Sequence, residues 1–225
     1  MSHETVEQDY ITKVIATDGV IGKVFSFRCR QNHTAILGRL ELGEKLLRQT
    51  KSFAAIQFKT IKKGYCYILT TPSLENEKPP ALKDSFVNDL ASDLDFLHEN
   101  KLIHGDIRFA NILESDSGPK VIDFEPLLSI NSITPNAQVL KARHIHPDDL
   151  KAGQISALSD RLNFGIIAQV LQGYQYNKDM LINDLHGLCH KKSCGELIKL
   201  PLLRRSMGGN NHHSTMSSIN YLEII

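Results

Sequence analysis

The chain has 225 residues, of which 41% are hydrophobic, so it can bury a core in one domain or in two small lobes. Its formal net charge is +1 with both signs spread along the sequence, which argues against a nucleic-acid or anionic-membrane surface. No apolar run is long enough to span a bilayer, and the polar start is unlike a signal peptide. Four scattered cysteines fit a reduced, cytoplasmic protein better than a disulfide scaffold.

The first half of the chain alternates short apolar segments with turns. Residues 1–9 are polar, and two glycines, Gly19 and Gly22, follow a short β-branched segment. The predicted strands are residues 24–30, 33–37, 53–58 and 65–70, and the predicted helix is residues 40–50. This order predicts a small antiparallel sheet that carries one helix.

The second half is predicted to be mainly helical. A polar, proline-containing linker over residues 73–80 separates it from the first half. Apolar residues at helical spacing then predict a helix over residues 85–100, with Asp84 as its N-cap.

Three polar side chains between Leu102 and Glu125 suit a phosphate–metal centre. Asp106 and Asn111 lie in a polar loop, and Asp123 ends a brief strand that follows a turn. Phosphoryl transfer from ATP needs groups that neutralise the phosphate oxygens, and Mg²⁺ prefers carboxylate and amide oxygens as ligands. The alternative is a polar β-hairpin with unrelated acids.

This stretch resembles the catalytic loop and metal-binding turn of the eukaryotic-type protein kinases. The family pattern HRDxxxxN appears at residues 104–106 followed by Asn111, and the DFG pattern appears at residues 123–125. The resemblance covers roughly residues 14–206. It implies an α+β, two-lobed fold with a small antiparallel β N-lobe carrying one helix and a mainly α-helical, truncated C-lobe.

The resemblance also implies ATP and Mg²⁺ as cofactors and assigns roles to the site residues. Asp106 is the base or orienter of the acceptor hydroxyl, and Arg108 contacts the transferring phosphate. Asn111 and Asp123 bind the metal. Glu125 stands where the family has glycine and, as in choline- and aminoglycoside-kinase relatives, is a further candidate metal ligand.

The family's nucleotide-binding lysine has no obvious counterpart in this alignment. Gly19 and Gly22 resemble the glycine-rich loop, but Leu37 stands where the VAIK motif has its lysine. Lys23, under the glycine-rich loop, is the favoured substitute cation, and Arg39 is the alternative. Both could equally be solvated surface charges.

Further nucleotide contacts follow from the same alignment. Glu44 resembles the acid that pairs with the missing lysine. The residues expected around the adenine are Val24, Ala35 and Leu113, with backbone groups of Thr70 and Thr71 at the hinge and Leu69 as gatekeeper.

The C-terminal half carries weaker matches to the family. Asp160 resembles the aspartate that holds the catalytic-loop backbone, and Asp148 resembles the end of the activation segment, paired with Arg204. A segment of this kind favours a protein substrate over a small molecule. Because Gly105 replaces the arginine that receives an activation-loop phosphate, we expect a constitutive state or control by a regulatory protein partner.

The predicted organisation places a flexible N-terminus at residues 1–9, the N-lobe at 10–72, a hinge at 73–83, the C-lobe at 84–207 and a low-complexity tail at 208–225. His98 is predicted to lie on the surface of its helix. A metal-like cluster comprises His186, Cys189, His190 and Cys194, but its spacing does not match a standard zinc pair and favours surface positions.

The favoured function is an ATP- and Mg²⁺-dependent protein kinase that phosphorylates Ser or Thr of a protein substrate, in its own cytoplasm or, as a delivered effector, in a host's. A pseudokinase scaffold is the first alternative, supported by Thr17 and Leu37 at positions where the family has glycine and lysine. A small-molecule kinase of the choline or aminoglycoside type is the second, supported by the HGD and IDFE sequences.

Overall fold

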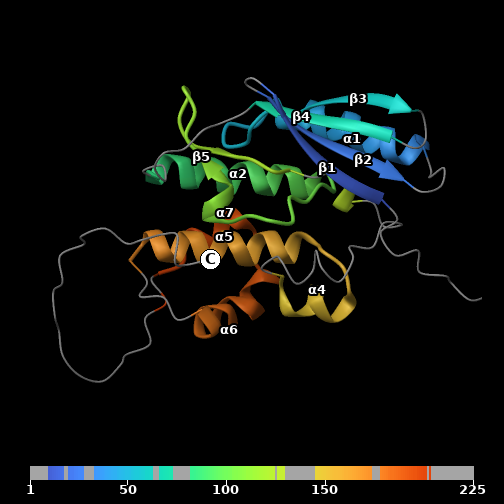
Figure 1. Ribbon diagram of the computed structural model, residues 1–225. Coiled ribbons are helices and arrows are strands. Elements are labelled where there is room, and N and C mark those ends of the chain that lie inside the picture. Colours follow the sequence, from blue (N-terminus) through green and yellow to red (C-terminus); the bar gives the residue numbers. More distant parts are fainter. Residues whose placement is uncertain are drawn as a thin grey trace, which may run out of the picture.

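The computed structural model describes residues 10–17, 20–27, 33–62, 66–72, 82–124, 126–129, 145–173, 178–201 and 203. Strands and one helix form the N-terminal half, and helices dominate the C-terminal half (Figure 1). This mixed α+β architecture is consistent with a truncated, kinase-like two-lobed fold, as the sequence predicts. No helix in the described part of the chain is both long and apolar enough to cross a membrane.

The N-terminal sheet is antiparallel throughout. Its strands are β1 (Tyr10–Thr17), β2 (Val20–Phe27), β3 (Gln57–Lys62) and β4 (Cys66–Pro72), in the order β1-β2-β4-β3. Helix α1 (His33–Leu47) follows β2 and lies against one face of the sheet (Figure 1).

Helix α1 corrects two predictions from the sequence. Residues 33–37, predicted to be a strand, form its first turns, and the helix ends before residue 50. Ile36, Leu40 and Leu47 are all buried, and their spacing of four and seven residues places them on one helical face. The short apolar run at residues 34–37 looked like a strand because helical periodicity shows only when the whole segment is considered. The strand predicted at 53–58 is likewise displaced, since β3 begins at Gln57.

The C-terminal half begins with α2 (Asp84–Glu99), close to its predicted range, although its N-cap is Lys83 rather than Asp84. Within the described residues, two short 3-10 turns, a two-stranded sheet and four further helices follow. They are η1 (Phe109–Asn111), β5 (Ile112–Leu113), β6 (Lys120–Val121), η2 (Pro126–Ser129), α4 (Pro147–Ala152), α5 (Ala157–Leu171), α6 (Lys178–Cys189) and α7 (Cys194–Leu197).

One hydrophobic core runs through both halves of the molecule. It contains fully buried residues of the sheet and α1, such as Phe25 and Leu40, together with Leu90 and Leu94 of α2 and Phe164 of α5. The two halves are therefore packed on each other rather than joined only by the chain.

A buried carboxylate also ties the halves together. Asp93 of α2 accepts hydrogen bonds from the backbone N–H of Lys51 at 2.8 Å and from both the N–H and the hydroxyl of Ser52 at 2.7 Å. The N–H of Val121, in β6, donates to the carbonyl of Ser52 at 2.7 Å. The segment after α1 is thus anchored to α2 and to the hairpin that leads to Asp123.

Candidate functional site

The loop before η1 brings Asp106 and Asn111 into contact. The amide nitrogen of Asn111 donates to the backbone carbonyl of Asp106 at 2.8 Å and to its Oδ2 at 3.1 Å. The two residues are 4% and 6% exposed. Arg108 adds a guanidinium nitrogen at 3.5 Å from the same Oδ2. Three of the four predicted catalytic residues therefore share one small constellation.

His104 connects this loop to the strand that precedes Asp123. Its Nε2 lies 2.9 Å from the carbonyl of Ile122, and the backbone N–H of Asp106 donates to its Nδ1 at 3.1 Å. A carbonyl can only accept, so Nε2 carries the proton and Nδ1 the lone pair. Burial lowers the pKa of His104, which keeps the ring neutral and both bonds intact.

Asp160 holds the loop from below, as the sequence predicts. Its carboxylate accepts the backbone N–H groups of His104 at 2.8 Å and Gly105 at 2.7 Å, and Nε2 of His98 lies 3.0 Å away. Burial opposes ionisation of Asp160, but the hydrogen bonds from the His98 side chain and the His104 backbone outweigh it and lower its pKa. The surface position predicted for His98 is wrong, because its side chain is only 5% exposed.

Gly105 has a structural reason to be glycine. Its φ of 79° lies in the left-handed region, which a side chain disfavours, and this conformation directs its N–H at Asp160.

Asp123 is also in a left-handed conformation, with φ of 71°. This is uncommon for a residue with a side chain and costs of order 1 kcal/mol, so its persistence marks a constrained position. Phe124 anchors the turn: it is 3% exposed, and its ring lies 5.8 Å from His104 and 6.3 Å from Phe53, both edge-on.

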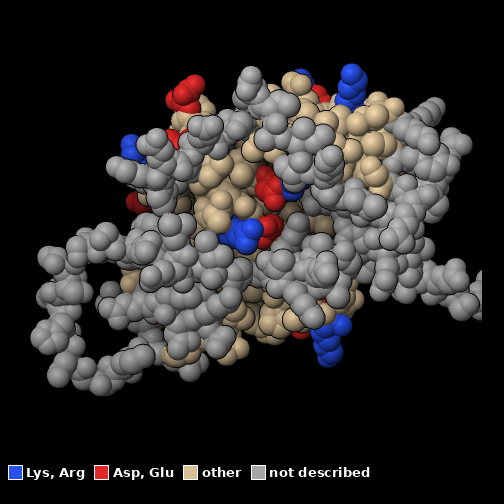
Figure 2. Space-filling model, viewed as in Figure 1, with Lys and Arg blue, Asp and Glu red and all other residues tan. Residues whose placement is uncertain are grey.

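Lys23 of β2 forms an ion pair with Oδ1 of Asp123. The two side chains are 19% and 31% exposed, so the pair is partly open to solvent. A lysine from the N-terminal sheet therefore meets an acid from the C-terminal half. Figure 2 shows acidic and basic side chains next to one another near the middle of this face.

The position of Lys23 revises the alignment of the N-terminal half. In protein kinases the phosphate-binding lysine lies on the strand that precedes the αC helix. Here Lys23 lies on β2, the strand that precedes helix α1, as that lysine does, whereas Leu37 lies within the helix. The signal was present in the sequence as Val20-Ile21-Gly22-Lys23, which is similar to VAIK.

Three other predicted contacts lose their basis with this revision. Ala35 lies in α1, so it is not on a strand above a purine. Arg39, also in α1, donates to the carbonyl of Lys101 at 3.1 Å. Glu44 pairs with Arg48 at 2.5 Å on the same helix, while Lys23 pairs with Asp123.

The register of β2 and β4 sorts the remaining candidates by sheet face. Lys23 pairs with Leu69 and Ile21 pairs with Thr71, so these four side chains share a face. The hydroxyl of Thr71 is buried and has no hydrogen-bond partner among the described residues. The Lys23 face therefore carries a leucine, Leu69, that is buried in the core, and a buried hydroxyl without a partner among the described residues. Ile21 was not recognised from the sequence as a neighbour of Lys23, because this segment was assigned to the glycine-rich motif.

Val24, Gly22 and Thr70 belong to the opposite face by strand alternation. Thr70 pairs with Gly22 on one side and with Gln57 on the other, so its backbone groups point along the sheet rather than toward a ligand. These predicted contacts do not converge with Lys23.

Four further predictions have different outcomes. Leu113 lies in β5, opposite Lys120, and is partly exposed. Gly19 and Glu125 lie outside the described residues, as does Arg204, the predicted partner of Asp148.

The residues present fit a magnesium nucleotide. Asp106, Asn111 and Asp123 supply carboxylate and amide oxygens, which suit a hard divalent cation. Nε of Arg108 is buried and has no hydrogen-bond partner among the described residues, and such an atom is suited to a phosphate oxygen. Lys23 pairs with Asp123 and Arg108 lies beside Asp106, so each of these acids has a positive group next to it.

No protein-family model matches the chain. Local similarity exists to serine/threonine-protein kinase PknB of Mycobacterium leprae, at 31% identity over 101 residues, which are 42% of this chain and 16% of that protein. PknB of Mycobacterium tuberculosis matches at 31% over 106 residues, 44% of this chain and 17% of that protein. The probable serine/threonine-protein kinase mkcF of Dictyostelium discoideum matches at 34% identity over 79 residues, which are 35% of this chain and 12% of that protein.

The matched segment is thus less than half of this chain and under a fifth of each relative's length. Within these limits, the chain is locally similar to serine/threonine-protein kinases, and its two-part α+β fold is consistent with that similarity.

Proposed function

We propose that the chain is an ATP- and Mg²⁺-dependent protein kinase that transfers the γ-phosphoryl group to a Ser or Thr hydroxyl of a protein. The observation that carries this proposal is the pairing of Lys23 with Asp123, beside the joined Asp106 and Asn111. A lysine on the strand before the helix and two acids on the catalytic hairpin are the groups that this chemistry requires.

Each residue has a role that follows from its position. Lys23 binds phosphate oxygens, and its present bond to Asp123 holds it close to where a metal-bound phosphate would lie. Asp106 orients the substrate hydroxyl and accepts its proton, because Asn111 and Arg108 already fix the Asp106 carboxylate. Asn111 and Asp123 would hold Mg²⁺, which when bound neutralises charge on the transferring phosphate. Arg108 then adds a second positive charge.

The test is transfer of labelled phosphate from ATP to a generic basic protein in the presence of magnesium. We expect transfer by the unchanged chain and none by Asp123→Ala. Lys23→Met should lower the rate by about 10²–10³-fold, because it removes a positioned charge that stabilises the transition state. Leu37→Ala, in α1, is the matched control and should retain the rate.

Other results of this assay would support one of the alternative functions. Nucleotide binding that depends on magnesium, without any transfer, would make the chain a pseudokinase. Transfer to amino-alcohols or aminoglycosides but not to proteins would identify a small-molecule kinase. Full activity of Lys23→Met together with loss in Leu37→Ala would remove Lys23 from the mechanism.

A further inference from the structure

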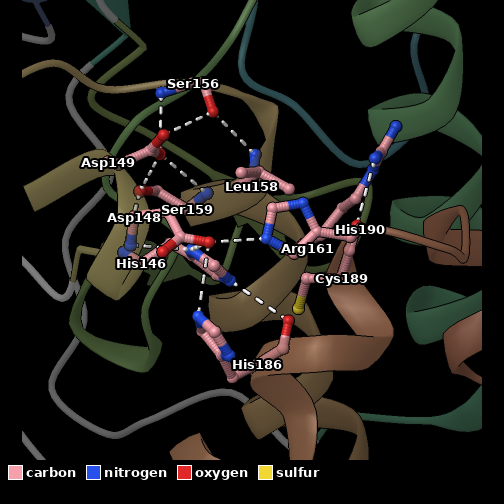
Figure 3. Close-up of polar contacts among 10 residues, drawn as sticks. All are labelled: His146, Asp148, Asp149, Ser156, Leu158, Ser159, Arg161, His186, Cys189 and His190. Atoms are coloured by element: carbon pink, nitrogen blue, oxygen red, sulfur yellow. Dashed lines mark hydrogen bonds and ion pairs between the residues drawn. The ribbon is translucent and has the colours of Figure 1, made fainter. Parts of the chain in front are cut away.

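Four side chains remote from the proposed phosphotransfer residues in sequence converge at the junction of α4 and α6. They are His146, Asp148, His186 and His190, and Figure 3 shows them pointing toward one another. Each offers one ligand atom, and these four atoms all lie within 4.8 Å of one another. Spacing in the sequence had linked His186 and His190 with cysteines, but His146 and Asp148 are their partners in space.

We propose that these four residues form a Zn²⁺ site. Oδ2 of Asp148 lies 2.7 Å from Nε2 of His190, 3.4 Å from Nε2 of His186 and 3.9 Å from Nδ1 of His146. Tetrahedral zinc with ligands at 2.0–2.1 Å separates neighbouring donor atoms by about 3.3 Å. The observed separations bracket this value, so small side-chain shifts would close the site around an ion.

The protonation of His146 is set by its surroundings. Its Nε2 lies 3.2 Å from the backbone carbonyl of His186, which can only accept, so Nε2 carries the proton. The lone pair is then on Nδ1, which accepts the backbone N–H of Asp148 at 3.2 Å and lies 3.9 Å from its Oδ2, so a metal bound at this atom would replace that hydrogen bond. A metal-binding histidine usually donates its other ring N–H to a carbonyl or carboxylate in this way.

The backbone around the site is held by contacts that do not involve the metal. Asp149, 2% exposed, accepts from the hydroxyl of Ser156 at 2.7 Å and from that of Ser159 at 2.6 Å. The hydroxyl of Ser159 in turn accepts the N–H of His146 at 3.0 Å. Arg161 donates to the carbonyl of Cys189 at 3.2 Å, which fixes the end of α6 beside the site.

Hydrogen bonds account for part of the cluster, because Nδ1 of His146 accepts the N–H of Asp148 and His190 bonds the Asp148 carboxylate. Three imidazoles surround one carboxylate oxygen, and only His190 is at a good hydrogen-bond distance from it. The rings of His146 and His186 are stacked with centroids 4.6 Å apart, which disfavours charge on both. One cation at the centre would bind all four groups. His186 lies in α6 and His190 directly follows it, and their four-residue spacing is that of the histidine pair in helical zinc motifs.

Four protein ligands leave no open position, so the ion would be structural rather than catalytic. It would join the entry to α4 to the end of α6. Imidazole also suits copper and nickel, so the choice of zinc is part of the claim to be tested.

The experiment uses the full, untagged chain after removal of metal by a chelator. Zn²⁺ is titrated against a competing indicator, and bound metal is counted after gel filtration. We expect one equivalent, and about 100-fold weaker binding in Asp148→Asn and in His190→Asn, since loss of even a supporting partner weakens such sites 10–100-fold. Zinc at about 100 times its dissociation constant should raise the melting temperature by about 5–10 °C.

The variants avoid the buried His146, whose replacement could unfold α4, and circular dichroism checks that each variant folds. The tail contains His212 and His213, which could bind zinc by themselves. The matched control is therefore the double variant His212→Gln, His213→Gln, which should bind as the unchanged chain does. Loss of binding in that control, no zinc binding by the unchanged chain, or tight binding of Cu²⁺ or Ni²⁺ but not Zn²⁺ would each overturn the proposal.

Discussion

Asp160 is the residue on which the geometry of the loop at residues 104–108 depends. A fully buried carboxylate is unfavourable unless its lone pairs are satisfied, and here two backbone N–H groups and His98 satisfy them. The same bonds fix the chain direction at His104 and Gly105. The orientation of Asp106, the next residue, follows from this anchor.

Replacing this carboxylate tests its structural role. We expect Asp160→Asn to lower the free energy of unfolding by about 2–4 kcal/mol, because an amide cannot accept all three charge-assisted bonds. Asp89→Asn on the exposed side of α2 is the control and should cost less than about 1 kcal/mol. Urea unfolding followed by circular dichroism measures both. Equal effects of the two changes would contradict this account.

The pH dependence has a definite sign. The pKa of Asp160 is lower in the folded chain than in the unfolded chain, so its stabilisation is present above the unfolded value and is lost as pH falls through the folded one. The difference in stability between the unchanged chain and Asp160→Asn should therefore shrink below about pH 4. A difference that grows on acidification would mean that the pKa is raised instead.

At the scale of elements, the contact between α1 and η2 governs how the N-terminal helix approaches the chain after Asp123. Gly43 of α1 faces Pro126, and a Cβ at this position would lie 2.8 Å from the Pro126 ring. Gly38 on the same helix has no atom within 4 Å of the corresponding position. One glycine permits a close contact, and the other is simply a weak helix former.

These two glycines form a matched pair of substitutions. Gly38→Ala should raise the free energy of unfolding by about 0.5–1 kcal/mol, which is the difference in helix propensity. Gly43→Ala should instead lower it by about 1–3 kcal/mol, because overpacking against Pro126 outweighs the same propensity gain. Chemical denaturation of both variants measures these two changes in the free energy of unfolding. Stabilisation by Gly43→Ala would show that α1 can shift away from η2 at little cost.

At the scale of the whole molecule, one core spans the sheet and the helices. Phe25 of β2, Leu40 of α1 and Leu94 of α2 belong to the same cluster of buried residues. Because the halves share this core and the Asp93 network, separating them would expose apolar surface and leave a buried carboxylate without its donors.

We therefore expect the chain to unfold in a single cooperative transition. Circular dichroism at helical wavelengths would follow mainly the C-terminal half, and tyrosine fluorescence would include Tyr67 of β4, which is fully buried. Midpoints from the two probes should coincide. A lower midpoint for tyrosine fluorescence would mean that the sheet unfolds independently.

Local patterns in the sequence were enough to predict several features of this protein. Helical periodicity located α2 to within about a residue at each end, and the order of turns and apolar segments indicated an α+β fold. The predicted proximity of Asp106 and Asn111 is seen in their hydrogen bond, because they lie five residues apart in one loop. The short hairpin of β5 and β6 then leads from Asn111 toward Asp123.

Other features depended on contacts between distant segments. Residues 33–37 are helical because α1 buries a continuous face against the sheet and core, which a four-residue pattern cannot reveal. Lys23 is far from Asp123 in the sequence, and only the packing of the two halves brings them together. In the same way, His146 lies near His190 only because the start of α4 packs near the end of α6. The sequence by itself determined which polar side chains lie in and beside the hairpin. The tertiary structure decided which cation faces it, since register and helix packing are collective properties of the folded chain.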